Sequence, residues 1–444
     1  MTATLSVAIV GAGPSGFFLA EKLLGQTDRP VTVDLYERLP VPYGLVRFGV
    51  APDHEKIKAV TRSFDKVAAR PGFRFFGNVE IGRDISVDQL RQAYDAVAFT
   101  TGAQSDRRMG IPGEDLINSH PATEFVAWYN GHPDFRDRHF NLDAENVAVV
   151  GVGNVAVDVA RILSRSPEEL AKTDIADHAL EALRHSKVRN VYLLGRRGPA
   201  QAAFTTPEVK ELGEMELADA VALPDEVALD PLSAAQVAAD DDPSIKRKIE
   251  VLTQFAARTP SGKPKRLTLR FLVSPTELVD DGTGRVGAIR LANNRLVDKN
   301  GSIAAEPTGQ SETLPVGLVF RSVGYKGIPI EGLPFDAKTG TIPNQGGRVA
   351  EGLYVAGWIK RGPSGVIGTN KPDAAATAEA ILAEIRAPSA EPQAPPSAER
   401  RVPSAEIDWP AWLRINAAET ALGKATNRPR VKFTSIEAML NAAR

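Results

Sequence analysis

The chain has 444 residues, of which 43% are hydrophobic and 24% are charged, a composition typical of a globular protein with two or three domains. The formal net charge of -2 argues against a general nucleic-acid-binding surface, and no nucleic-acid partner is expected. The chain has no cysteine, which excludes disulfide bonds, cysteine-ligated metal centres and a thiol redox pair. No metal site is predicted.

The N-terminal sequence enters a strand without a basic region followed by a long apolar stretch, so no signal peptide is expected. No run approaches the roughly 18 apolar residues of a membrane span. We therefore expect a cytoplasmic protein.

The first 37 residues follow a strand, turn, helix and strand pattern. The turn GAGPSG places Gly11, Gly13 and Gly16 in the GxGxxG spacing, and Glu37 ends the next strand. Such a turn lets the backbone approach a pyrophosphate at a helix N-terminus, while an acidic strand end accepts hydrogen bonds from ribose hydroxyls. The motif alone fits FAD or NAD equally well.

The same order of elements returns at residues 146–195. In GVGNVA, Gly151 and Gly153 are followed by Ala156, a small residue accepted at the third position. The second strand ends in LLGRRG, with Arg196 and Arg197 where the acidic residue is expected. A carboxylate repels the 2′-phosphate of NADPH, whereas a guanidinium pairs with it, so this second site is predicted to prefer NADPH. The duplication favours FAD at the first site.

Strand-like runs also precede glycine turns at 96–102, 318–324 and 353–357, as parallel strands do at a ligand-binding sheet edge. The stretch 387–406 is rich in Pro, Ala, Ser and Glu and is predicted to be a linker. The last segment regains helical spacing at Trp412, Ile415 and Leu422, which predicts a helical tail packed on the body.

Three long blocks of the chain are unusual: YERLPVPYGLVRFGVAPDHEKIK (36–58), GRRGPAQAAFTTPEVKEL (195–212) and AGWIKRGPSGVIGTNKPDA (356–374). These blocks resemble the NADPH–ferredoxin reductases of the adrenodoxin reductase type, and the terminal NRPRVKF is similar to actinobacterial members. The resemblance implies an α/β protein with two Rossmann-like dinucleotide-binding domains. The FAD domain would be discontinuous, 1–105 and 321–444, with an NADP domain, 106–320, inserted into it.

The resemblance also implies the residues that contact each cofactor. Those expected at FAD, beside the glycines of the first turn, are Ser15, Glu37, Leu45, Trp358, Gly365, Val366 and Ile367. Those expected at NADP(H), beside the glycines of the second turn, are Arg107, Asn154, Val155, Arg196, Arg197 and Glu208, with Gly365 near both cofactors. Trp358 departs from the Asp that many flavoproteins carry at that strand end.

Hydride transfer from NADPH to the flavin, followed by release of single electrons to an iron–sulfur carrier, is the implied reaction. His54 and Glu211 are the candidates for managing protons and charge near the flavin, although a lone His is as often structural. A basic stretch could dock an acidic ferredoxin, with a solvated face as the alternative. The docking residues are Lys246, Arg247, Lys248, Lys263, Lys265 and Arg266.

The sequence excludes one related function and is compatible with two others. A disulfide reductase is excluded by the absence of cysteine. An NADPH–quinone or dye reductase is the alternative enzyme, because reduced flavin can release electrons to many acceptors. A nucleotide-bound regulatory protein without turnover is the alternative outside the enzymes.

Overall fold

A computed structural model describes residues 4–386 and 407–444, so the predicted linker 387–406 lies outside the described residues. The chain divides into two compact units. Unit 1 takes its described residues from Met1–Ser105, Asn130–Pro133 and Gly324–Arg444, and unit 2 consists of Asp106–Tyr129 and Asp134–Val323. The predicted first domain was 1–105 and 321–444; the first segment of unit 1 ends at Ser105, its last segment begins at Gly324, and the short segment Asn130–Pro133, which was not predicted, also belongs to it.

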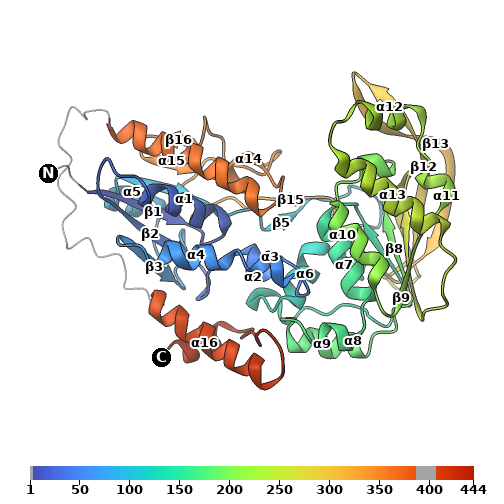
Figure 1. Cartoon of the computed structure of the whole chain (residues 1–444), viewed down its shortest axis with the longest axis horizontal. Helices are drawn as coiled ribbons and strands as arrows, with labels where there is room; N and C mark the ends of the chain where they lie inside the picture. The colour runs from blue at the N-terminus through green and yellow to red at the C-terminus, as the bar shows by residue number, and fades with distance from the viewer. Residues whose placement is uncertain (1–3, 387–406) are drawn as a thin grey trace. The chain divides into compact units, whose positions relative to one another are not determined.

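Unit 1 is built on a six-stranded sheet in the order β16-β17-β4-β1-β2-β3 (Figure 1). All neighbours run parallel except β16 and β17. The strands are β1 (Leu5–Val10), β2 (Val31–Glu37), β3 (Phe73–Gly77), β4 (Ala96–Phe99), β16 (Arg348–Ala350) and β17 (Leu353–Val355). The helices are α1 (Pro14–Leu24), α2 (Leu45–Phe48), α3 (Glu55–Lys58), α4 (Thr61–Ala68), α5 (Val87–Ala93), α14 (Trp358–Arg361), α15 (Asn370–Arg386), α16 (Trp409–Ala425) and α17 (Ile436–Ala443).

Helix α1 shows why this part of the sequence folds as it does. Pro14 stands in its first turn, where the missing N–H is not needed, and Gly25 caps its end. Its apolar residues Phe17, Leu19 and Leu23 are fully buried. Helices α1 and α15 pack against each other although they lie far apart in the sequence (Figure 1).

The C-terminal segment packs on unit 1, as predicted. Trp412 and Ile415 are buried in its core, but Leu422 is 45% exposed, so the prediction was wrong for that residue. The burial places Leu422 on the outward face of α16.

A buried ion-pair network fixes α16 to α2. Glu419 is fully buried and accepts hydrogen bonds from both terminal nitrogens of Arg47, at 2.9 and 2.5 Å. It also accepts from Arg430 Nη1, at 3.2 Å, and from the Phe433 amide, at 2.9 Å. The Lys432 ammonium donates to the Asn130 carbonyl at 3.2 Å, which ties residues 130–133 to the tail. Both carboxylate oxygens of Glu419 therefore accept hydrogen bonds from protein groups, which replace the water that Glu419 loses on burial.

Unit 2 holds a second six-stranded sheet, in the order β6-β14-β7-β8-β10-β9, with all neighbours parallel. The strands are β6 (Ser119–Pro121), β7 (Asn146–Val150), β8 (Asn190–Leu194), β9 (Ala218–Ala222), β10 (Lys265–Arg270) and β14 (Leu318–Arg321). The helices are α6 (Ala122–Tyr129), α7 (Asn154–Ser164), α8 (Pro167–Leu170), α9 (Asp177–Arg184), α10 (Thr206–Glu211), α11 (Pro224–Val227), α12 (Pro231–Ala239) and α13 (Pro243–Ala257).

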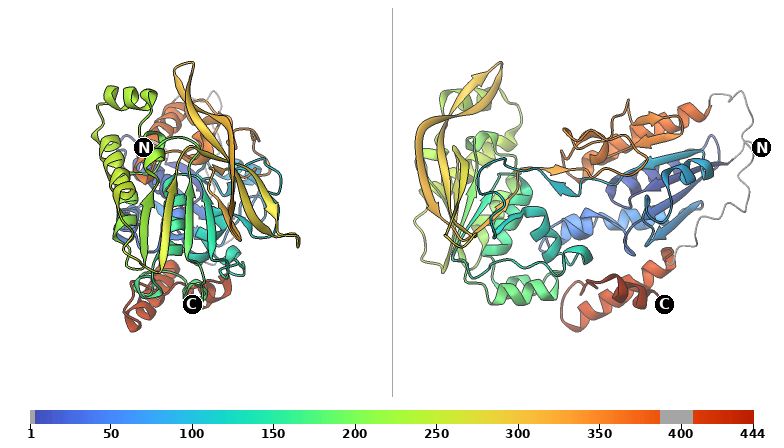
Figure 2. Two further views of the ribbon diagram at one scale, coloured as in Figure 1. Left: turned by 90° about the vertical axis from the view of Figure 1, so that its right-hand side faces the viewer. Right: turned by 180° about the vertical axis from the view of Figure 1, so that it is seen from behind.

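Unit 2 also carries a three-stranded antiparallel sheet that we did not predict. Its strands are β11 (Val273–Asp280), β12 (Val286–Lys299) and β13 (Ser302–Pro315). The long hairpin of β12 and β13 extends past the parallel sheet (Figure 2). Apolar residues of β11 and β12, including Val273, Ile289 and Leu291, pack against β7 and β14 and attach this sheet to the unit.

In each unit a glycine turn connects a parallel strand, β1 in unit 1 and β7 in unit 2, to the helix that follows it. Both turns lie at the carboxyl edge of their sheet. The predicted fold class is confirmed: the protein is α/β, with two Rossmann-like units and one of them inserted into the other.

Candidate functional site: two dinucleotide-binding turns

The first glycine turn follows β1. Gly11 has a φ of +107°, and a Cβ at this position would lie 2.8 Å from the Thr100 carbonyl oxygen, so only glycine fits. A Cβ at Gly16 would lie 2.2 Å from the Gly11 oxygen, which explains the third glycine by packing. At Gly13, in contrast, a Cβ would meet nothing within 4 Å. The middle glycine therefore faces open space beside the start of α1, where a pyrophosphate could approach the helix N-terminus.

Glu37 ends β2 next to this turn. Its carboxylate accepts the Ala12 amide at 3.0 Å and the Leu39 amide at 3.2 Å, one on each oxygen. Burial raises the pKa of Glu37, and these two N–H groups oppose the rise. Each carboxylate oxygen can accept a second hydrogen bond. Glu37 is therefore held rigidly and still has acceptor capacity for ribose hydroxyls.

The turn after β17 meets the first glycine turn at the same sheet edge. Ser15 is buried, and its Oγ lies 3.1 Å from Asn370 Oδ1. A Cβ at Gly357 would lie 2.1 Å from that Ser15 oxygen. Asp373, which the sequence analysis did not single out, accepts the Gly357 amide at 2.5 Å and pairs with Lys360 at 3.0 Å. An acidic residue in the first turn of α15 was the signal that could have revealed it.

The remaining predicted FAD contacts lie on turns of unit 1. Trp358 begins α14 and donates from its indole nitrogen to the Ser364 carbonyl at 3.1 Å. Gly365 has a φ of +77°, and Val366, which is 56% exposed, and Ile367 lead into α15.

The segment that carries Leu45 crosses close to the first glycine turn. The Tyr43 amide donates to the Ala12 carbonyl at 2.8 Å, and a Cβ at Gly44 would lie 3.1 Å from the Gly13 Cα. Leu45, at the start of α2, is 37% exposed. His54 lies further along, buried at the start of α3, with its carbonyl accepting the Ile57 amide.

The second glycine turn, in unit 2, repeats the geometry of the first. Gly151 has a φ of +132°, and a Cβ there would lie 2.2 Å from the Ser322 carbonyl oxygen. A Cβ at Gly153 would meet nothing within 4 Å. Asn154 is the first residue of α7, and its side-chain oxygen accepts the Thr205 amide at 2.9 Å. This hydrogen bond orders the loop that follows Arg197. Val155, the next residue, is partly buried.

Arg196 and Arg197 follow β8 at the edge where the second turn lies. Arg196 is exposed and Arg197 half-buried. Within the described residues, neither guanidinium has a hydrogen-bond or ion-pair partner. Burial and the neighbouring charge of Arg196 lower the pKa of Arg197. Two adjacent cations without a carboxylate form a site suited to a phosphate.

The other predicted coenzyme and catalytic residues of unit 2 divide into two groups. Arg107 is exposed, just after the boundary with unit 1. Glu208 and Glu211, both on α10, lie against the fully buried Arg161 of α7, at 3.3 and 3.9 Å. Asp158 is a third carboxylate on this arginine, at 2.7 Å. Asp158 and Arg161 were missed because helical spacing alone does not reveal a buried ion pair.

The prediction that the basic stretch forms a single docking surface is wrong. Lys248 is buried, and its ammonium donates to the Ala202 carbonyl. The Lys265 ammonium donates to the Leu163 carbonyl at 2.7 Å at the end of α7, and burial lowers the pKa of Lys265 to about 8. Lys263 donates to the Met215 carbonyl at 2.6 Å. These three ammonium groups serve internal contacts rather than a partner.

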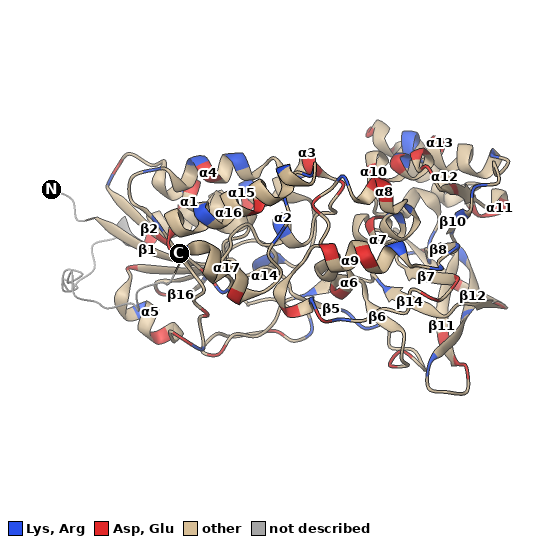
Figure 3. Cartoon of the chain, turned by 90° about the horizontal axis from the view of Figure 1, so that it is seen from below, with Lys and Arg blue, Asp and Glu red and all other residues tan. Residues whose placement is uncertain are grey.

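The exposed members of the basic stretch lie at opposite edges of the parallel sheet. Arg266 stands at the beginning of β10, the amino edge. Lys246 and Arg247 stand in the first turns of α13, next to Ser244, whose carbonyl accepts a hydrogen bond from Thr206 at the carboxyl edge. Lys and Arg are spread over several elements of unit 2 with Asp and Glu among them (Figure 3).

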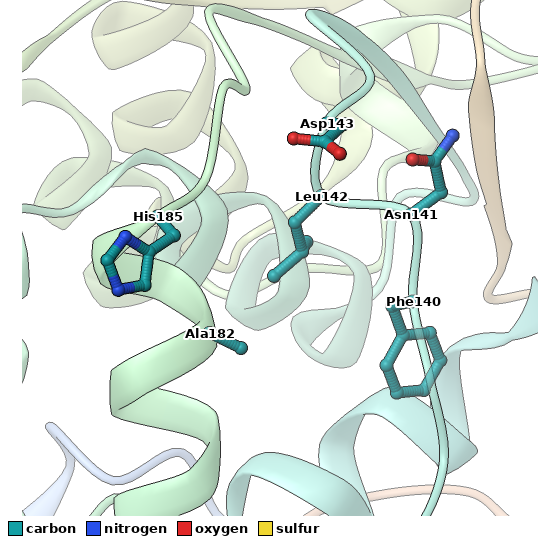
Figure 4. Close-up of a pocket in the computed structure, with 6 residues that line it drawn as sticks. All are labelled: Phe140, Asn141, Leu142, Asp143, Ala182 and His185. Carbon is teal, nitrogen blue, oxygen red and sulfur yellow. The ribbon is translucent and has the colours of Figure 1, made fainter.

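A small hollow in unit 2 is unrelated to the glycine turns. It lies where α9 ends and before β7 begins, at the amino edge of the sheet (Figure 4). It is lined by Phe140, Asn141, Leu142, Asp143, Ala182 and His185. None of these was a predicted site residue.

Within residues 4–386 and 407–444, no helix is long and apolar enough to cross a bilayer.

Comparison with known proteins gives a consistent result. The family model described as pyridine nucleotide-disulphide oxidoreductase matches residues 5–197. The chain is 46% identical to NADPH-ferredoxin reductase FprA of Mycobacterium tuberculosis over 98% of each chain. It is 40% identical to human mitochondrial NADPH:adrenodoxin oxidoreductase, covering 98% of this chain and 91% of that protein.

The solved structure of Mycobacterium tuberculosis FprA in complex with NADPH is similar, with a TM-score of 0.93, 44% identity and 99% of both chains covered. The disulphide chemistry in the family model's description cannot apply here, because the chain has no cysteine. The two glycine turns and the full-length similarity together show that this chain belongs to the NADPH–ferredoxin reductase family.

Proposed function

We propose that this chain is a flavoprotein that takes a hydride from NADPH onto FAD and passes single electrons to a ferredoxin-type iron–sulfur protein. The observation that carries the proposal is the Arg196–Arg197 pair, which has no acidic partner among the described residues and follows the strand next to a second glycine turn. A cytoplasmic location is part of the proposal.

Unit 1 fits FAD on two observations. Gly13 leaves the space that a side chain would fill, and Glu37 keeps acceptor capacity beside it. We therefore assign FAD to unit 1, with Ser15, Glu37, Leu45, Trp358, Gly365, Val366 and Ile367 as its contacts. When bound, FAD supplies a ring that accepts a hydride and releases electrons one at a time.

Unit 2 is assigned to NADP(H). Arg196 and Arg197 bind the 2′-phosphate, and Gly153 leaves room for the pyrophosphate at the start of α7. Arg107, Asn154, Val155 and Glu208 are the further contacts in this proposal. Their support is the family resemblance, together with the order that Asn154 imposes on the loop at Thr205.

His54 and Glu211 are proposed to hold protons and charge near the reacting ring. A histidine changes charge near neutral pH, and a carboxylate on a buried arginine stays in a fixed position. Hydride transfer itself needs no base, so these residues tune the reaction rather than drive it.

The function is tested with purified protein under anaerobic conditions. NADPH should bleach the yellow flavin much faster than NADH, and added ferredoxin should accelerate cytochrome c reduction. If NADPH leaves the flavin oxidised, the protein is no reductase. If ferredoxin adds nothing to cytochrome c reduction, a quinone or dye reductase becomes the better assignment.

Lys246 and Arg247 are the proposed docking residues for an acidic ferredoxin. Reversing both charges, Lys246→Glu with Arg247→Glu, is expected to lower the ferredoxin-dependent rate about 10-fold at low salt, because charge complementarity steers encounter. The loss should shrink at high salt as screening increases. Stopped-flow measurement of ferredoxin reduction against salt concentration checks this.

Arg266→Glu is the matched control, since this exposed arginine lies at the opposite sheet edge. It is expected to change the rate by less than about twofold. Equal losses in both variants would show that net charge, not a docking site, sets the rate.

A further inference from the structure

The backbone of the two coenzyme-selecting arginines is held by residues far away in the sequence. Asn294 of β12 is buried, and its Nδ2 donates to the Arg196 carbonyl at 2.9 Å. The Leu272 amide donates to the Arg197 carbonyl at 3.2 Å. The Asn294 amide in turn donates to the Leu272 carbonyl at 2.7 Å, so the contacts form a connected chain.

Local geometry explains why Asn294 reaches this loop. The pairing of β12 with β13 shifts register between Ala292 and Asn294, an irregularity of the kind that redirects a side chain. Leu272 has a φ of +56°, an unusual conformation for leucine, in the connection from β10 to β11. A carbonyl only accepts, so the amide nitrogen of Asn294 must face Arg196.

The antiparallel sheet supports the loop from a second point. A Cβ at Gly198 would lie 3.4 Å from the Leu296 side chain of the same strand. The side chains of Arg196 and Arg197, in contrast, have no hydrogen-bond or ion-pair partner in the described parts of the chain. The main chain is thus fixed while the guanidinium groups are left to a ligand, an arrangement that lowers the entropy cost of binding an anion.

We propose that Asn294 is a positioning residue for NADPH selection: it fixes the main chain at Arg196 so that the arginine pair meets the 2′-phosphate. The inference rests on the proposed function of Arg196 and Arg197. It assigns to the antiparallel sheet a role in coenzyme choice.

The test compares two probes that differ in the 2′-phosphate, adenosine 2′,5′-bisphosphate and adenosine 5′-monophosphate. In the full-length protein with its flavin, Asn294→Leu is expected to weaken binding of the bisphosphate about 3- to 10-fold, the effect of one lost hydrogen bond. Binding of the monophosphate should change less than about twofold. Isothermal titration calorimetry measures both, and the KM for NADPH should rise by a similar factor with the KM for NADH unchanged.

Ser274→Ala is the matched control. Ser274 Oγ is the other acceptor of Asn294 Nδ2, at 2.8 Å, and its removal leaves the bond to Arg196 intact. This variant should bind both probes as the unmodified protein does. Asn294→Ala replaces Asn294→Leu if the larger side chain prevents folding, as judged by circular dichroism and flavin content.

Two results would overturn the inference. If Asn294→Leu weakened the binding of both probes equally, Asn294 would only support the fold. If it left the preference for the bisphosphate over the monophosphate unchanged, the Arg196 carbonyl would need no anchor. These differ from a failure of the proposed function, in which the unmodified protein itself would bind the two probes equally well.

Discussion

Replacing both Arg196 and Arg197 by alanine is expected to raise the KM for NADPH by about 100-fold or more and to leave the KM for NADH nearly unchanged. Each charge-assisted hydrogen bond to a phosphate contributes roughly 1.5–3 kcal/mol, and two such contacts would be lost together. The two guanidinium groups make no hydrogen bond or ion pair with other described residues, and alanine keeps the main-chain carbonyls that Asn294 and Leu272 contact, so the double substitution should not disturb the fold. Steady-state kinetics with both coenzymes measures the effect.

Each single variant should lose part of this preference, and Arg197→Ala should resemble Arg196→Ala. Arg266→Ala serves as the control for a lost surface charge, because this exposed residue lies at the other edge of the sheet. An equal rise in the KM for NADPH and for NADH would show that Arg196 and Arg197 are solvated loop residues that do not select the coenzyme.

Replacing Glu419 by glutamine is expected to lower the Tm of the protein by about 10 °C. Removing one partner of a buried ion pair costs about 3–5 kcal/mol, because the opposite charge is left buried without compensation. Here both Arg47, which is 5% exposed, and Arg430 would lose the carboxylate, and the Phe433 amide would lose a charged acceptor. Differential scanning calorimetry of the flavin-containing protein measures the shift.

Glu379→Gln is the matched control, since it removes an exposed carboxylate in the same unit, 3.5 Å from Lys22. Exposed ion pairs contribute little, so its Tm should fall by less than about 2 °C. A shift of the same small size for Glu419→Gln would contradict the anchoring role of the network. The double change Arg47→Met with Glu419→Leu should recover part of the lost stability, because apolar replacement also removes the buried charge.

Much of the geometry of the two candidate sites could be predicted from the sequence because the signals for the two glycine turns are local. Gly11, Gly13 and Glu37 stand within one strand, turn, helix and strand unit, and the sheet then brings them to one edge. The place of the Arg196–Arg197 pair beside the second turn could be predicted for the same reason, since the end of β8 follows that turn by a fixed topology.

The parts that could not be predicted depend on contacts between distant segments. Lys248 and Arg266 belong to one basic stretch, yet α13 returns across the unit before β10 begins, so the stretch is divided between two sheet edges. Asn294 lies nearly 100 residues from Arg196 in sequence, on a strand whose polar pattern gave no indication of a buried side chain. Its position depends on a register shift, which sequence patterns specify poorly.

The insertion of unit 2 has a consequence for synthesis on the ribosome, where the chain emerges from its N-terminus. Every residue of unit 2 has been made once Val323 is added, whereas the core of unit 1 still needs Tyr354, Ala378 and Trp412. Unit 2 can therefore fold first, while β1, β2 and β4 wait with an uncovered apolar face for α15 and α16. The unit that carries the first glycine turn, although its synthesis begins first, is completed last.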